Sequence, residues 1–337
     1  MARRLMKGRG MNDVVSRFFV LAVVASLVPA CLQDGPDAPD QADTAGGKGD
    51  VWGTDDRVER YEITSASLRE VARSEAGLVR TVDLAHDTTR DVWSVTSPRT
   101  LGQAQHLCAG ERFADQPVVA YCSATLIADD IMVSAGHCFE AIGCQDLVVA
   151  FDVAYDAAPG DPMQVASEIP ATNVYQCTEV LSTEYSVDYD TDRGADYAVF
   201  RLDRAVTGRV PAHVNWNEPL IDGTSAYVIG HPSGIPAKLA AGSILDGTTN
   251  PDFIEHDADV FGGNSGCGLF DPAGTLIGIH DHSSAQRYVA GPSGTCNVVA
   301  VCDGNAECPR KPHAYDLRAL RTKLSPELRM QLGAPLN

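Results

Sequence analysis

The sequence has few basic side chains. It holds 26 lysines and arginines against 45 aspartates and glutamates, which gives 337 residues a formal net charge of −19. A surface of this charge repels phosphate backbones and anionic lipid headgroups. Nucleic acid is therefore not an expected partner. The rest of the composition, 44% hydrophobic and 21% charged, is that of a globular chain long enough for one large domain or two average ones.

The sequence also lacks an N-terminal apolar run long enough to span a bilayer. The run from Phe18 to Ala30 covers about 13 residues, where roughly 20 are needed. Basic residues precede it and small residues end it, which is the layout of a secretory signal. We expect residues 1–30 to be removed on export, giving a secreted or cell-envelope protein of a bacterium. Cys31 resembles the lipidated cysteine of a bacterial lipoprotein, and a lipid there is the only membrane contact expected; plain cleavage after Ala30 is the alternative.

No fixed-period repeat is present, and residues 32–50 lack the apolar residues of a core. This segment is rich in Asp, Pro, Gly and Ala and contains one large aliphatic residue, Leu32. We predict that residues 31–50 form a flexible tether or propeptide. Residues 51–98 are interpreted as an N-terminal extension. A short helix is expected between Ser65 and Val82, where apolar residues fall near helical spacing.

After about residue 115 short apolar runs alternate with clusters of Asp, Gly and Pro. Many short strands with few helical segments favour an all-β barrel or sandwich. The runs expected to form strands include 117–121, 124–127, 131–134, 147–151, 197–202, 226–229, 268–270 and 276–279.

Three local signals lie within this β-rich part. His137 stands beside Cys138, and Cys122 lies sixteen positions before Cys138, so a disulfide between them would fix the loop that presents the imidazole. Asp196 opens an apolar strand. Ser265 lies in a glycine-dense turn, and such glycines let backbone N–H groups converge on one point, as an oxyanion hole requires. Each signal alone has a structural alternative: a structural or metal-binding histidine, a strand-end cap and a surface turn.

Together, the order His, Asp, Ser on a β-rich exported chain resembles that of the trypsin-like (chymotrypsin-fold) serine proteases. The resemblance covers about residues 100–325. It implies an all-β double six-stranded β-barrel, which we place at residues 99–325, with a C-terminal tail at residues 326–337. Bacterial glutamyl endopeptidases are the closer likeness, because a Gly-Ile-His segment ending at His280 follows the serine at a similar distance. The residues after Val51 also resemble the start of their mature chains.

Three residues depart from the usual pattern of that group, and none belongs to the triad. Cys267 and Gly268 stand where the group usually has Ser and Pro, and Ala124 replaces a glycine. These departures concern the shape of the leaving-group side of the site. The expected reaction is unchanged.

The resemblance implies an exported serine endopeptidase, monomeric, that hydrolyses protein or peptide substrates without a metal or organic cofactor. His137 is expected to be the general base and acid, Asp196 to orient it, and Ser265 to be the nucleophile. The N–H groups of Gly263 and Ser265 would form the oxyanion hole. No Cys-x-x-Cys or His-Glu-x-x-His spacing indicates a zinc site. The alternatives are a catalytically silent homologue that binds proteins and an esterase with the same triad.

Three residues near the nucleophile give conflicting signals on substrate choice. His280 matches the histidine that helps to receive the substrate carboxylate in glutamyl-specific relatives, but Val260 replaces the threonine or serine that shares this task. Asp259, six residues before Ser265, lies roughly where trypsins keep the acid that binds Lys and Arg. The sequence therefore leaves open whether the P1 side chain is acidic or basic. It also leaves open that Asp259 and His280 have only structural roles.

Activation is expected to differ from that of trypsin. Asn264 stands where trypsins keep the aspartate that pairs with a new N-terminal ammonium, and its neutral amide cannot supply that charge. We expect an oxyanion hole that forms without this switch, and maturation of the chain at or near Val51.

Overall fold

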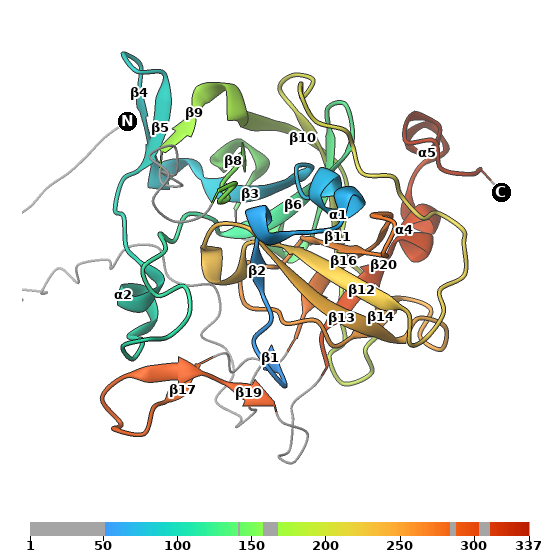
Figure 1. The fold of residues 1–337 in the computed structure, drawn as a ribbon. Helices are drawn as coiled ribbons and strands as arrows, with labels where there is room; N and C mark the ends of the chain where they lie inside the picture. Colours follow the sequence, from blue (N-terminus) through green and yellow to red (C-terminus); the bar gives the residue numbers. More distant parts are fainter. Residues whose placement is uncertain (1–50, 141, 158–167, 284–287, 303–310, 337) are drawn as a thin grey trace, which may run out of the picture. The chain divides into compact units, whose positions relative to one another are not determined.

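The computed structural model describes residues 51–140, 142–157, 168–283, 288–302 and 311–336. These residues form mainly strands and loops, with five short α-helices (Figure 1). The expected signal peptide, the lipidation site Cys31 and the tether at 31–50 lie outside the described residues. Within the described ranges, no helix is both long and apolar enough to cross a membrane.

The first barrel is closed and has six strands in the order β10, β11, β7, β6, β3 and β8. Strand β8 explains how the sequence closes it: Val149 and Phe151 pack inside the barrel, while Val148 and Ala150 pack against a second apolar cluster on the outside. A strand buried on both faces needs apolar residues at every position. The strands are β3 (Glu75–Arg80), β6 (Cys122–Ala128), β7 (Ile131–Ser134), β8 (Leu147–Phe151), β10 (Val174–Tyr185) and β11 (Asp196–Leu202).

The second barrel also has six strands, in the order β12, β15, β16, β20, β14 and β13, and pairing of β12 with β13 closes it. Strand β2 (Val58–Glu59) adds to the outside of β13. The strands are β12 (Ser225–Gly230), β13 (Lys238–Asp246), β14 (Phe253–His256), β15 (Gly268–Phe270), β16 (Leu276–His282) and β20 (His313–Asp316).

The two barrels share one apolar cluster. Ile131 and Val199 of the first barrel and Ile229, Ile279 and Tyr315 of the second belong to it, and all are buried. Burial of these apolar side chains packs the two barrels against each other.

Shorter elements surround the barrels. Small sheets are formed by β1 (Val51–Trp52) with β19 (Val301–Cys302), by β4 (Leu84–Asp87), β5 (Val92–Val95) and β9 (Glu168–Pro170), and by β17 (Tyr288–Ala290) with β18 (Asn297–Val299). The α-helices are α1 (Ala66–Val71), α2 (Leu101–Gln105), α3 (His137–Glu140), α4 (Leu317–Lys323) and α5 (Pro326–Gln331). Disulfides join Cys108 to Cys296, Cys122 to Cys138 and Cys144 to Cys177.

The predicted double six-stranded barrel is confirmed, and two local predictions of secondary structure are wrong. The helix expected from Ser65 to Val82 covers only α1, because β3 pairs with both β6 and β8 and its residues are strand. Barrel strand β3 thus lies inside the range interpreted as an extension. Residues 117–121 form no named strand; instead the amides of Val119 and Ala120 donate to the Gly234 carbonyl. The expected tail contains α5, which Ser325 caps.

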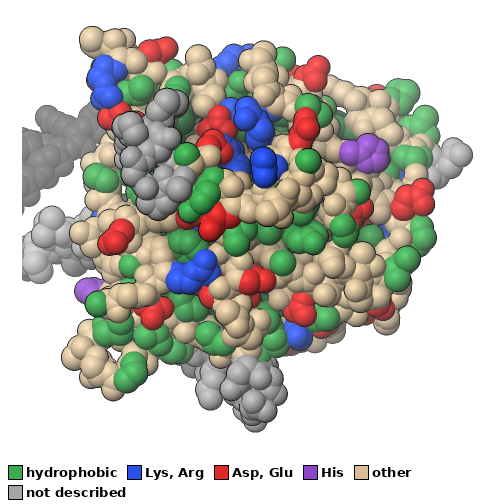
Figure 2. Space-filling model, in the orientation of Figure 1, with side chains coloured by type: hydrophobic (Ala, Val, Ile, Leu, Met, Phe, Trp, Pro, Cys, Tyr) green, Lys and Arg blue, Asp and Glu red, His purple; other side chains and the backbone are tan. Residues whose placement is uncertain are grey.

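Charge on the surface is mixed in sign. On the face that Figure 2 shows, Lys and Arg side chains lie beside Asp and Glu side chains. Elsewhere among the described residues, the surface side chains of Arg90 and Glu168 form an ion pair.

Candidate active site

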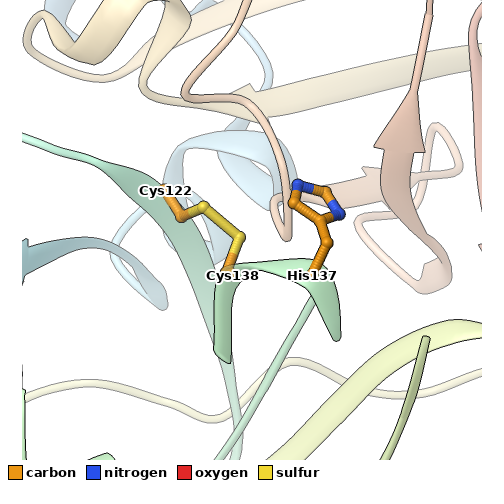
Figure 3. Close-up of side chains that lie close together, drawn as sticks. All are labelled: Cys122, His137 and Cys138. Carbon is orange, nitrogen blue, oxygen red and sulfur yellow. A yellow bond between two sulfur atoms is a disulfide. The ribbon is translucent and has the colours of Figure 1, made fainter. Parts of the chain in front are cut away.

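His137 is held in place by the first barrel. It opens the short helix α3 directly after β7, and the next residue, Cys138, is completely buried and bonded to Cys122 of β6. Figure 3 shows the imidazole and the disulfide extending from adjacent positions of this helix. The disulfide therefore ties the histidine loop to a barrel strand, while the imidazole keeps 26% of its surface exposed.

Asp196 is the fixed partner of His137. It opens β11, is fully buried, and lies beside the histidine loop. One carboxylate oxygen accepts the backbone N–H of His137 at 3.0 Å, and the other lies 2.6 Å from its Nδ1. When Nδ1–H donates to the carboxylate, the basic lone pair of the imidazole is on Nε2.

Ser123 of β6 connects the serine turn to the first barrel. Its backbone N–H donates to the Ser265 carbonyl at 2.8 Å, and its hydroxyl donates to the Gly263 carbonyl at 2.7 Å. The same hydroxyl accepts the backbone N–H of His231 at 3.0 Å. The Ser265 carbonyl also lies 3.8 Å from Sγ of Cys138. Ser265 is thus anchored beside the residue that follows His137.

Gly266 allows this close approach. Its φ of +86° is unfavourable for other residues, and a Cβ there would lie 2.1 Å from the Ser134 hydroxyl and 2.3 Å from the Ser123 carbonyl. On the other side, the Gly266 N–H donates to the His280 carbonyl at 2.7 Å. The serine turn therefore spans both barrels.

The turn also presents two backbone donors. Gly263 has a φ of +91°, and a Cβ on it would lie 2.5 Å from the His231 carbonyl, so no other residue fits without strain. Within the described ranges, the N–H groups of Gly263 and Ser265 have no protein acceptor. Asn264 between them is buried, and its side-chain oxygen accepts the Phe261 N–H at 3.0 Å. Two adjacent free donors are what an oxyanion hole needs.

The three residues predicted for substrate choice are all buried. The Asp259 carboxylate accepts the backbone N–H groups of Trp52 at 2.8 Å and Asp56 at 3.2 Å. Val260 belongs to the apolar interior of the second barrel. His280 is 2% exposed, and its ring meets that of His256 edge to face at 5.6 Å.

Two buried carboxyl groups near the site were missed by the sequence analysis. Glu75 of β3 accepts the Thr125 hydroxyl, and burial raises its pKa well above the usual range. Asp281 of β16 lies 2.6 Å from Nδ1 of His282, and burial also raises its pKa. For Glu75 the available signal was a carboxyl group at the head of the apolar run 75–79. For Asp281 it was the His-Asp-His sequence at 280–282.

Comparison with known proteins identifies the family of this region. Residues 122–279 match the family model of the trypsin-like peptidase domain. The chloroplastic Protease Do-like 1 of Arabidopsis thaliana is 35% identical over 104 residues, 28% of this chain and 23% of that protein. The chain thus spans about a quarter of the length of this relative.

Two solved structures illustrate more distant likenesses. A Glu endopeptidase is 15% identical with a TM-score of 0.42, over 80% of this chain and 94% of that one. A serine endoprotease from Yersinia pestis is 17% identical with a TM-score of 0.39, over 69% and 61% of the two chains.

Proposed function

Because this chain contains a trypsin-like peptidase domain, we propose that it is an exported serine endopeptidase that works through an acyl-enzyme on Ser265. The observation that carries the proposal is the pair of contacts from His137 to the buried Asp196 carboxylate, at 3.0 Å and 2.6 Å, beside a turn that anchors Ser265. A buried carboxylate with both oxygens on one histidine residue orients that imidazole as a base.

The first step is attack by the Ser265 hydroxyl on the substrate carbonyl. A serine hydroxyl is a weak nucleophile at neutral pH, so His137 takes its proton at Nε2 as the new C–O bond forms. The imidazolium that results is stabilised by Asp196. Collapse of the tetrahedral intermediate breaks the C–N bond, and His137 returns the proton to the leaving amine. Water then hydrolyses the acyl-enzyme by the same sequence of proton transfers.

The negative charge on the tetrahedral intermediate needs preorganised donors. The N–H groups of Gly263 and Ser265 are suited to this task, because they have no acceptor within the described ranges and belong to a turn held at both ends. Loss of one such donor costs about 3–4 kcal/mol in comparable hydrolases.

Export is supported by the cysteines. Within the described ranges, three disulfides bridge segments that are 16, 33 and 188 residues apart in the sequence. Disulfides persist in oxidising compartments and are rare in the cytosol. The protein is therefore inferred to work outside the cytoplasm, with protein or peptide substrates.

The test compares the purified enzyme with three variants on a peptide library. We expect Ser265→Ala and His137→Ala each to lower kcat by about 10⁶-fold, without adding when combined, because the two side chains act as one unit. Asp196→Asn should leave more residual activity, with a loss of about 10⁴-fold. Circular dichroism of each variant checks the fold. Wild-type peptidase activity in Ser265→Ala would overturn the proposal, and hydrolysis of esters but not peptides would indicate an esterase.

A further inference from the structure

Three side chains able to bind a metal lie close together, and none of them belongs to the proposed triad. Asp192 comes from the loop between β10 and β11, His282 ends β16, and His313 begins β20, directly opposite His282 in the ladder. One ligand atom of each lies within 4.8 Å of the other two. Because the three residues are far apart in the sequence, no spacing motif indicates this cluster.

The distances in the cluster match the gaps around an ion. Nε2 of His282 lies 3.5 Å from one Asp192 carboxylate oxygen, and Nε2 of His313 lies 3.9 Å from the other. An N–H···O hydrogen bond spans about 2.7–3.2 Å, so both separations are longer than hydrogen bonds. Ligand atoms around a tetrahedral zinc ion, with bonds of about 2.0–2.2 Å, lie about 3.4 Å apart. The two separations are therefore within about 0.5 Å of the spacing around such an ion.

A second carboxylate orients His282 for this role. Asp281 is buried, and one of its oxygens lies 2.6 Å from Nδ1 of His282. When Nδ1–H donates to a carboxylate, the opposite nitrogen, Nε2, carries the lone pair that binds a metal. Asp281 thus fixes the tautomer in which Nε2 of His282 is directed at Asp192.

The surroundings of the two imidazoles are aromatic. Phe253 meets the His282 ring edge to face at 5.4 Å and the His313 ring at 6.3 Å. The two imidazoles are stacked, with centroids 4.6 Å apart and an interplanar angle of 9°. A metal lies near the plane of each imidazole that binds it, so one ring must turn about its Cβ–Cγ bond, a torsion with broad energy wells.

We propose that Asp192, His282 and His313 form a binding site for a divalent transition metal of the zinc class, with water completing the coordination. Two imidazole nitrogens and one carboxylate oxygen are donors that suit zinc. The proposal goes beyond the peptidase function and does not depend on it.

The cluster is connected to the histidine loop by aromatic contacts. The Tyr189 ring meets His282 edge to face at 5.2 Å, and its hydroxyl lies 2.9 Å from that of Tyr185. The Tyr185 ring in turn lies 5.8 Å from that of His137. A metal bound to Asp192 and His282 would hold the loop that carries Tyr189 and so fix this contact chain.

Isothermal titration calorimetry with zinc sulfate tests the proposal on the Ser265→Ala protein, in which self-digestion cannot interfere. We expect one zinc per chain, and loss of this binding in His313→Gln and in Asp192→Asn. Asp281→Asn keeps the ligands but loses the orienting carboxylate, so it should weaken zinc binding about 10–100-fold. The experiment measures zinc binding and not hydrolysis, so its result does not depend on whether the protein is a peptidase.

His86→Gln is the matched control, since His86 also lies near a carboxylate, that of Asp91 at 3.1 Å, outside the cluster. Its zinc affinity should equal that of the parent. No zinc binding by the parent, or equal binding by the parent and Asp192→Asn, would overturn the proposal. Asp192 lies on a surface loop, so this variant carries the test if His313→Gln fails to fold.

Discussion

Two buried carboxyl groups of the first barrel differ in what surrounds them. Asp196 has donors on both oxygens, the backbone N–H and Nδ1 of His137. Glu75 accepts the Thr125 hydroxyl and the Gly268 N–H, but no positive charge lies among its pKa-shifting neighbours. Burial without a counter-charge favours the protonated form, so the pKa of Glu75 is raised.

This raised pKa makes stability depend on pH. In the unfolded chain Glu75 ionises near its ordinary pKa of 4.5, while the folded chain keeps the proton to higher pH. The folded state therefore binds more protons above this pH, and this group's contribution to the unfolding free energy falls as pH rises. We expect Glu75→Gln to gain stability relative to wild type as pH rises from about 4.5 to 8. Denaturant unfolding across this range measures the difference in unfolding free energy between variant and wild type. Glu70→Gln, at an exposed position, is the control. A difference for Glu75→Gln that stays constant with pH would contradict the prediction.

Substrate choice is also expected to depend on single residues. Asp259 already accepts two backbone N–H groups of the N-terminal segment, at 2.8 Å and 3.2 Å, which leaves it poorly placed to bind a basic side chain. We therefore expect cleavage after Glu or Asp, weakened in His280→Ala. Cleavage sites in a peptide library, read by mass spectrometry, test this. Cleavage only after Arg or Lys, lost in Asp259→Ala, would reverse the assignment.

Among single residues, the sequence analysis found those that stand in local motifs. It missed those whose role depends on contacts made in the folded chain. His137, Asp196 and Ser265 each stand in a short pattern of characteristic neighbours. Ser123 has no such pattern, because its partners Ser265, Gly263 and His231 are more than a hundred residues away in the sequence. Hydrogen bonds between residues so far apart in the sequence can be identified only from the folded structure.

Strand β6 shows how an element supports the serine turn. Through Ser123 it donates to the carbonyls of Ser265 and Gly263 and accepts the His231 N–H. Burial lowers the pKa of His231 to about 4, so its ring is neutral at pH 7 and adds no charge beside the turn. The turn is held by neutral hydrogen bonds from a barrel strand.

Loss of the Ser123 hydroxyl should therefore affect stability and catalysis together. Ser123→Ala leaves the buried Gly263 carbonyl and His231 N–H without this partner, at a cost of about 1–3 kcal/mol each. Because Gly263 contributes to the proposed oxyanion hole, we expect kcat to fall more than KM rises. Ser182→Ala on β10, whose hydroxyl meets that of Tyr197, is the control. Steady-state kinetics that match wild type would contradict this role of β6.

The elements themselves were only partly predictable. The apolar runs predicted β7 and β8 with the bounds that the structure shows. A strand buried on both faces is a continuous run of apolar residues, which is easy to recognise in a sequence. Helical spacing from Ser65 to Val82 was misleading, because β3 is buried on both faces and its apolar residues imitate a helix. Helix α5 was missed although Ser325 and Pro326 form a recognisable N-terminal signal.

Across the whole molecule, the N-terminal segment is built into the second barrel. Val51 is fully buried in the parallel pair of β1 and β19, and β2 adds to β13. Burial raises the pKa of Asp259 to about 7 while it binds this segment. A new α-ammonium at Val51, one residue from the amide that Asp259 accepts, would offset the cost of ionising that carboxylate.

We therefore expect the active secreted form to begin at or near Val51. Edman degradation or intact-mass measurement of the protein secreted by its host determines this start. Full activity from a chain that begins at Cys31 would contradict it. An Asn264→Asp variant should in addition acquire a need for proteolytic activation, because it introduces the buried charge that the wild-type turn avoids.

The proposed reaction is tested most directly by identifying the residue that acts as the nucleophile. The purified mature protein is incubated with a fluorophosphonate, and the modified peptide is identified by tandem mass spectrometry. We expect one adduct, on Ser265, formed about 10³-fold more slowly in His137→Ala, roughly the contribution of a general base. An adduct on any other residue, or none on a protein that hydrolyses peptides, would contradict it.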